Sequence, residues 1–480
     1  MPFGSANLAA TADAAVATLS AAPLARPALD PRTRRLLEAP IAATLVRLAL
    51  PNMLVMVVQA SLGLIETYFI GWLGTAALAG IALVFPAVML MQMMSAGAVG
   101  GGIASAVARA LGGGRREDAD RLAVHAVAIS IAVALGFSIA ALLGGRALYS
   151  AMGGSGPALD AALTYSNVVF AGIVLVWVFN ALANVIRGTG NMAFPAWVSI
   201  GGTVFLVPLS PCLILGLGPF PRLGVAGGAV AVVLYYAAGI AVLGGYLASG
   251  RGVIRLSLRG VRLETRFFRE ILRVGAVAAL ITVQTNATVA VATALVGRFG
   301  PAAIAGYGVG SRLEYLLVPL VFGLGSPLVA MVGTNIGAGQ GKRALRAAWI
   351  GAAIAFGLTE TIGLAAAALP GAWIRLFGTD PTLLASGSLY LRVVGPCYGL
   401  FGLGMALYFA SQGAGRLRWP LTAAVTRFAI AAGGGWLAFR LTGDLVAVFT
   451  ALAVALAVFG AVNAAAVAAG AWFTAQPARD

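Results

Sequence analysis

Twelve apolar runs, each long enough to cross a lipid bilayer, constrain this chain more than any other feature of its sequence. A helix needs about 20 apolar residues to cross the roughly 30 Å hydrocarbon core. The strands of a membrane β-barrel would instead give segments of about ten residues with alternating polarity. The pattern therefore predicts an all-α integral membrane protein with twelve transmembrane helices. The runs cover approximately 46–72, 80–110, 122–147, 162–187, 193–217, 224–248, 271–297, 305–336, 346–370, 387–411, 419–440 and 446–473.

The composition excludes several classes of function. Only 10% of the residues are charged and 60% are hydrophobic, whereas about 25% are charged in soluble domains. The net charge of +16 does not indicate nucleic-acid binding, because the basic residues lie between apolar runs and form no basic surface stripe. Two cysteines and one histidine give no disulfide framework and no metal-ligand spacing. We therefore expect no enzyme activity, cofactor, metal or nucleic-acid partner.

The positions of the basic residues predict the orientation. Lys and Arg are retained in short cytoplasmic loops. With the N-terminus inside, cytoplasmic segments and adjoining helix ends carry 23 of the 31 basic residues, and outer segments carry five. We therefore expect a multi-pass protein of the cytoplasmic membrane with both termini in the cytoplasm. Residues 1–40 are Ala-rich, and the first 25 lack the basic residues of a secretory signal. They are predicted to be a disordered tail, and 475–480 a short second tail.

The chain contains an internal repeat of six spans. An offset of 226 places Gly71–Gly80 on Gly297–Gly306, and an offset of 225 places Leu111–Gly114 on Ile336–Gly339. Because each repeat has an even number of spans, the two repeats have the same orientation and are related by a pseudo-two-fold axis along the membrane normal. We expect two six-helix lobes that enclose a cleft. The lobes are predicted at 41–250 and 271–474, joined by a basic cytoplasmic linker at 251–270.

Short motifs at matching places in this pattern resemble those of a known transporter family. They are Leu48–Pro51, Ile65–Gly71, Ala110–Gly114, Arg187–Asn191 and Gln412–Gly415. In their order and spacing they resemble the multidrug and toxic compound extrusion (MATE) transporters over roughly residues 41–473. This resemblance implies a two-lobe antiporter that exports organic, often cationic, compounds by alternating access, driven by protons or sodium.

Glu66 is the leading candidate for ion coupling. An ionisable residue inside a bilayer costs at least about 2.5 to 3.5 kcal/mol and tends to be functional. Gln59 and Gly63 precede Glu66 by seven and three residues and share its helix face. In the family, the position of Glu66 resembles the coupling carboxylate, and that of Gln59 a cavity-lining polar residue. Pro51 interrupts the same span, so we expect protonation of Glu66 to let the helix bend there and narrow the first-lobe cavity.

The coupling ion predicted from these residues is the proton. Sodium-coupled members of the family carry an Asn and an Asp four residues apart on the fifth helix. The corresponding positions in this chain resemble Leu206 and Ser210. Sodium needs several hard oxygen ligands, and Glu66, Ser210 and backbone carbonyls near Pro208 and Pro211 make a sparse set. We therefore favour protons and keep sodium as the alternative.

Neutral polar residues in the fourth and seventh spans are candidates for the substrate cavity. Asn180 and Asn184 lie one helical turn apart and can present two amides to the same space. Gln284 and Asn286 lie near the middle of the seventh span. Contacts between neighbouring helices within a lobe are an equally good explanation for both pairs, because Asn and Gln often join helices in membranes.

Arg312, Glu314 and Glu360 are charged residues within predicted spans of the second half. Arg312 and Glu314 are two residues apart, point to different sides and are poor partners for each other. We expect Arg312 to pair with Glu360 of the ninth span as a structural ion pair, with a role in the cleft as the alternative for Glu314.

The sequence thus predicts a monomeric antiporter that exports small organic compounds, mostly lipophilic cations. The alternative is a flippase for lipid-linked precursors, which would need buried arginines facing a pyrophosphate. Only Arg312, Arg392 and Arg427 lie within the spans to serve that purpose.

Overall fold

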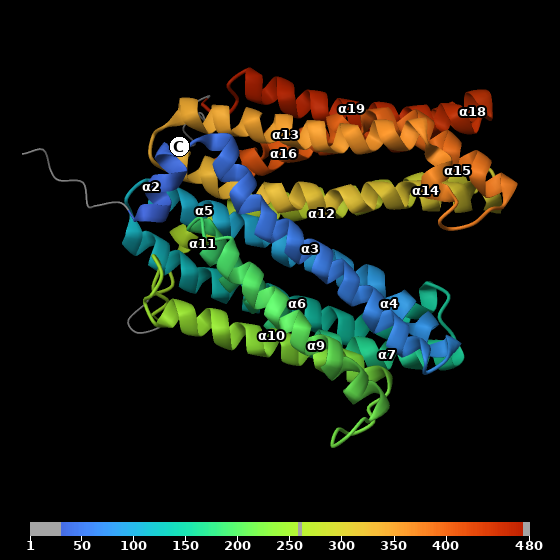
Figure 1. The fold of residues 1–480 in the computed structure, drawn as a ribbon, viewed down its shortest axis with the longest axis horizontal. Helices are drawn as coiled ribbons and strands as arrows, with labels where there is room; N and C mark the ends of the chain where they lie inside the picture. Colours follow the sequence, from blue (N-terminus) through green and yellow to red (C-terminus); the bar gives the residue numbers. More distant parts are fainter. Residues whose placement is uncertain (1–29, 258–261, 474–480) are drawn as a thin grey trace, which may run out of the picture.

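The computed structural model describes residues 30–257 and 262–473, apart from the side chains of 60–64 and 315. The described chain is helical and forms two lobes (Figure 1). The predicted fold class, an all-α membrane protein with two six-helix lobes, is confirmed. Within the described residues, eleven helices are long and apolar enough to cross a membrane, or up to twelve if the bent pair α7 and α8 counts as one span.

The first lobe follows a short helix, α2 (Pro31–Glu38). It has its own buried apolar core, which includes Trp177, Tyr149 and Phe179. Its helices are α3 (Ile41–Gly71), α4 (Thr75–Met93), the π-helix η1 (Met94–Val99), α5 (Gly100–Gly112), α6 (Arg116–Ala151), α7 (Gly156–Ala171), α8 (Ile173–Gly188), α9 (Ala193–Leu215) and α10 (Val225–Ala248).

The second lobe has a separate core that includes Tyr390, Tyr398 and Phe449. Its helices are α11 (Thr265–Gly297), α12 (Pro301–Gly337), α13 (Gly341–Ala368), α14 (Pro370–Ile374), α15 (Pro381–Val394), the 3-10 helix η2 (Gly395–Cys397), α16 (Tyr398–Ala414), α17 (Arg418–Ala429), the π-helix η3 (Ile430–Gly434), α18 (Gly435–Thr442) and α19 (Leu445–Ala468).

The fourth span is bent, although the sequence predicts one continuous run over 162–187. Helices α7 and α8 meet at Gly172 with an angle of 47° between them. A Cβ at Gly172 would lie 2.5 Å from the Val233 side chain of α10. The glycine therefore allows the bent span to pack closely on α10.

Two predicted boundaries are wrong. Residues 31–38, expected in a disordered tail, form helix α2, because Asp30 caps its first turn, Pro31 starts it, and Leu36 and Leu37 are buried. The predicted linker 251–270 ends earlier, since α11 begins at Thr265. Residues 1–29, 258–261 and 474–480, which include most of the predicted N-terminal tail and all of the predicted C-terminal tail, lie outside the described residues.

The first helix of each repeat starts on the opposite lobe. Ile41, Leu45 and Ala49 at the start of α3 share a buried cluster with α12, α13 and α16 of the second lobe. Further along, Ile70 of α3 packs on Ile214 of its own lobe. The start of α11 likewise packs on α5, η1 and α6 of the first lobe. Both helices therefore bridge the lobes, and Pro51 lies where α3 leaves the second lobe for the first.

The lobes meet at one end of the molecule. We call this the basic end; it contains α2, the start of α11 and the end of α19 (Figure 1). Figure 1 shows the lobes side by side there and further apart toward the opposite end, which we call the far end. Asn52 of α3 also contacts the second lobe, since its Nδ2 donates to the backbone oxygen of Gly323 at 3.4 Å.

Candidate functional site

Glu66 lies inside the first lobe, in the part of α3 toward the far end. Its Oε1 accepts a hydrogen bond of 3.1 Å from the hydroxyl of Tyr165 on α7. Gly228 of α10 faces the same oxygen, so that a Cβ there would lie 3.0 Å from it. Among the described residues, no Lys or Arg forms an ion pair with Glu66. The structure thus places a carboxylate between three helices, with the Tyr165 hydroxyl as its hydrogen-bond donor.

Ser210 of α9 lies beside Glu66. Both residues line a small cavity together with Ile65, Leu206, Val207 and Val232. Ser210 is buried, and its hydroxyl has no hydrogen-bond partner within the described part of the protein. Leu206 contributes no oxygen, so this cavity offers an ion one carboxylate and one hydroxyl from side chains. No group of three or more His, Cys, Asp and Glu side chains within the described ranges is placed to hold a metal ion.

Two tyrosines of α10 extend the polar lining across the lobe. Gln92 of α4 donates a hydrogen bond of 3.2 Å to the hydroxyl of Tyr236. The adjacent Tyr235 interacts with the side chain of Gln59 on α3, and with Ser199 and Thr203 of α9. The structure therefore brings the predicted Gln59 into a polar group that sequence analysis did not identify. Its members are scattered over four helices, and no spacing in the sequence shows that they meet.

Asn180 and Asn184 are engaged in helix packing. Asn180 donates to Ser95 Oγ at 3.0 Å, and Asn184 to the backbone oxygen of Ala96 at 3.2 Å. The acceptors belong to η1, and a π-helix departs from the regular α-helical hydrogen-bond pattern. Both asparagines are buried. This arrangement favours the helix-contact explanation over a role in the substrate cavity.

The polar residues of α11 mostly bond within their own helix. Gln284 donates to Thr288 Oγ1 at 2.8 Å, and Asn286 to the backbone oxygen of Thr282 at 2.9 Å. Asn286 is exposed, whereas the buried Gln284 Oε1 has no partner among the described residues. Their role in binding a substrate stays a prediction.

The expected ion pair between Arg312 and Glu360 is not formed. Glu360 instead accepts a hydrogen bond of 2.7 Å from the backbone N–H of Gly399, and Arg312 lies over the ring of Phe377. Glu314 pairs with Arg427 of α17 at 3.4 Å and accepts from the Tyr390 hydroxyl at 3.2 Å. The correction has a geometric cause, because the faces of α12 and α13 that meet depend on helix packing and not on spacing in the sequence.

The Glu314–Arg427 pair predicts a strong asymmetry between single and double variants. Arg427 is buried against Phe401 and Phe459. Arg427→Gln leaves Glu314 without its cation and should destabilise the protein by about 3 to 5 kcal/mol, as is typical when one partner of a buried pair is removed. Adding Glu314→Gln should restore most of the loss. Thermal unfolding in detergent measures this, and a double variant less stable than Arg427→Gln would contradict a structural pair.

A reciprocal glycine contact closes the basic end. A Cβ at Gly112 of α5 would overlap the backbone oxygen of Thr334 on α12, and a Cβ at Gly337 would overlap the backbone oxygen of Arg109. The repeat offset of 225 relates Gly112 to Gly337 and Arg109 to Thr334, so the two contacts are equivalent. We call these four residues the glycine clasp. It brings the backbones of the two lobes together at the pseudo-two-fold axis.

Side chains from both lobes reinforce the closure around the clasp. Ser105 Oγ donates to the backbone oxygen of Gln412 at 2.5 Å, and Arg109 forms an ion pair with Glu270 at 3.6 Å. The Gln412 amide crosses in the other direction and donates to the backbone oxygen of Gly97 at 3.2 Å. Because Gly97 belongs to η1, this π-helix is bonded to both lobes.

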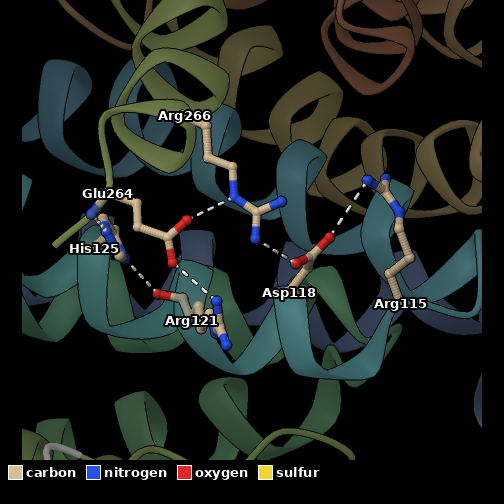
Figure 2. Close-up of polar contacts among 6 residues, drawn as sticks. All are labelled: Arg115, Asp118, Arg121, His125, Glu264 and Arg266. Carbon is tan, nitrogen blue, oxygen red and sulfur yellow. Dashed lines mark hydrogen bonds and ion pairs between the residues drawn. The ribbon is translucent and has the colours of Figure 1, made fainter. Parts of the chain in front are cut away.

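A network of charged residues holds the start of α11 on α6 (Figure 2). Glu264 pairs with Arg121 and Arg266, each at 2.8 Å, and Arg266 also reaches Asp118 at 3.1 Å. The fully buried His125 accepts a hydrogen bond of 2.8 Å at Nε2 from the backbone N–H of Glu264. Its Nδ1, 2.7 Å from the backbone oxygen of Arg121, must therefore carry the proton. The network ties the first helix of the second lobe to the first lobe.

This network predicts that His125 contributes more to stability than Glu264. His125→Ala removes a buried acceptor and leaves the Glu264 N–H unsatisfied, which costs about 1 to 3 kcal/mol. The Glu264 ion pairs are half-exposed, and such pairs contribute little. Thermal unfolding should therefore show a clearly larger loss for His125→Ala than for Glu264→Ala, and the reverse order would contradict the assignment.

The pKa of Glu264 determines the pH range over which the ion pairs of this network form. Desolvation would raise the pKa of Glu264, but hydrogen bonds and charges from Arg266 and Arg121 lower it below its ordinary value. Because the pKa is lowered in the folded state, the stabilisation is complete above the ordinary pKa and is lost as pH falls through the lowered value. The ion pairs of Glu264 should therefore persist throughout the neutral range.

Comparison with known proteins gives one consistent family. The family model described as MatE matches residues 51–212 and 278–437. The chain is 29% identical over 378 residues to a protein of Shewanella oneidensis named "FAD transporter", covering 78% of this chain and 82% of that protein. It is 29% identical over 404 residues to a protein of Deinococcus radiodurans named "Probable multidrug resistance protein NorM", covering 80% and 85%. A solved structure of a MOP superfamily transporter from Pyrococcus furiosus has a TM-score of 0.84 at 23% identity, covering 93% of this chain and all of that one.

Proposed function

The chain belongs to the MatE family of multidrug and toxic compound extrusion transporters, and from this we propose that it is a secondary antiporter exporting organic compounds in exchange for protons. The observation that carries the proposal is Glu66. It is a carboxylate inside the first lobe, with a tyrosine hydroxyl as hydrogen-bond donor and no basic partner among the described residues. Such a group can be charged in one state and neutral in the other, and an ion gradient can be coupled only through that difference.

We place the basic end in the cytoplasm, on the evidence of the basic loops. With that orientation, the glycine clasp closes the cytoplasmic side and the lobes diverge toward the outside. The structure then corresponds to an outward-facing state, in which a proton from outside reaches Glu66 and an organic molecule leaves. Return to the inward-facing state requires the clasp to separate while α3 and α11 stay anchored to both lobes.

The geometry supports an antiporter better than the lipid-linked flippase. Of the three arginines available for a pyrophosphate, Arg312 and Arg392 are exposed and Arg427 is paired with Glu314. The three do not form a buried cluster. A second candidate substrate is a dinucleotide such as FAD, because the Shewanella oneidensis relative is named for FAD transport.

Flux in proteoliposomes tests the proposal. We would measure accumulation of ethidium under a proton gradient or a sodium gradient imposed separately, and include FAD as a second substrate. We expect a proton gradient alone to drive ethidium. Transport that follows sodium alone would contradict the coupling ion, and FAD transport without ethidium transport would support the second candidate. Movement of neither compound under either gradient would contradict the proposed function.

A further inference from the structure

The first lobe contains a buried arginine that forms no ion pair with another described residue. Arg187, one residue from the basic end of α8, is 9% exposed, and its Nε has no hydrogen-bond partner among the described residues. Within the same described ranges, no carboxylate lies within ion-pair distance of it. The buried Arg427, by contrast, is paired with Glu314. Burying an unpaired charge costs free energy of desolvation. Packing alone therefore does not explain why a guanidinium is buried at this position.

Arg187 lies beside a group of neutral polar side chains. Tyr235 of α10 lies near the guanidinium, and its hydroxyl in turn interacts with Gln59, Ser199 and Thr203. These side chains come from α3, α8, α9 and α10, and none of them is acidic. The Thr203 hydroxyl already donates to the backbone oxygen of Ser199, so the Tyr235 hydroxyl and the Gln59 amide are the groups that can serve as donors beside the arginine. Such a set suits an oxyanion, which a guanidinium can bind through two parallel hydrogen bonds.

We propose that Arg187, with Tyr235 and Gln59, forms a subsite for an oxyanion group of the substrate, either a carboxylate or a phosphate. This inference rests on the proposed function, since it requires an organic molecule inside the first lobe. Arg187 lies toward the basic end, while Glu66 lies five residues from the far end of α3. The lobe therefore presents a positive and a negative site at different depths, and substrates that carry an acidic group bind with that group toward Arg187.

A matched pair of ligands tests the subsite. Riboflavin and flavin mononucleotide share one ring system and differ by a phosphate, and both can be quantified by fluorescence in equilibrium dialysis against the detergent-purified protein. We expect the wild type to bind flavin mononucleotide at least about tenfold more tightly than riboflavin, a difference of roughly 1.4 kcal/mol. Arg187→Gln should remove this preference, and Arg187→Lys should keep part of it. Binding of ethidium, which has no oxyanion, should be unchanged in both variants.

The controls separate this proposal from a structural role and from the proposed function. Arg392→Gln removes an exposed arginine of the other lobe and should leave the phosphate preference intact. Equal affinity of the wild type for the two flavins, or a preference that survives in Arg187→Gln, would overturn the subsite. Loss of ethidium binding as well in Arg187→Gln would indicate a structural role and would also overturn it. Ethidium transport by the wild type tests the proposed function independently of these outcomes.

Discussion

Glu66→Gln is expected to abolish proton-driven export while the protein remains folded. Glutamine keeps an oxygen that can accept the hydrogen bond from Tyr165, so the contact between α3 and α7 is preserved. It cannot exchange a proton, so the two conformations no longer differ in protonation and the gradient performs no work on the substrate. We expect accumulation of ethidium in proteoliposomes to fall at least about tenfold. This fall corresponds to a loss of about 1.4 kcal/mol or more in the free energy of the ethidium gradient.

Glu360→Gln is the matched control for this prediction. Glu360 also lies in a span, and it accepts a hydrogen bond from the Gly399 backbone, which glutamine can likewise accept. Ethidium transport by the Glu360→Gln variant should stay near that of the wild type. Equal losses in both variants would mean that the Glu66 effect is not specific to coupling, and full transport by Glu66→Gln would contradict the role of Glu66.

Gly112→Val is expected to stop transport by preventing closure of the basic end. Any Cβ at Gly112 overlaps the Thr334 backbone, and the equivalent change at Gly337 overlaps that of Arg109. Backbone cannot move aside as a flexible side chain can, so the lobes must separate. We expect the transporter to be held with the basic end open, with the same result for Gly337→Val.

Cysteine labelling measures this effect. Ser105 is fully buried between the lobes, so Ser105→Cys in a background without Cys212 and Cys397 should resist a water-soluble maleimide. The label should react readily once Gly112→Val is added. Gly144→Val is the matched control, because a Cβ there meets nothing within 4 Å. Protection of the cysteine in Gly112→Val, together with normal transport, would contradict the glycine clasp as the closing contact.

The spans and the repeat could be predicted from the sequence because each depends on a periodic property of the chain. Apolar run length determines what crosses a bilayer, and the offset of 225 correctly relates Gly112 to Gly337. Short elements were harder to predict. Helix α2 has eight residues, too few for an apolar periodicity, and it depends on burial against the second lobe.

The candidate site was only partly predictable. Glu66 could be identified because a carboxylate in an apolar run is unusual. Its donor Tyr165 is 99 residues away in the chain, and the group around Tyr235 draws on several helices. The true partner of Glu314 is Arg427, 113 residues away. Such pairings depend on how helices rotate against each other, and sequence spacing carries no information about that rotation.

Substrate-induced proton release tests the central claim most directly. Saturating ethidium would be added to purified protein in weakly buffered detergent solution containing a pH indicator, for the wild type and Glu66→Gln. If one carboxylate is shared between proton and substrate, the wild type should release up to about one proton per molecule when Glu66 is protonated before ethidium is added. Glu66→Gln should release none. Equal proton release by the two proteins would show that another group couples protons to the substrate.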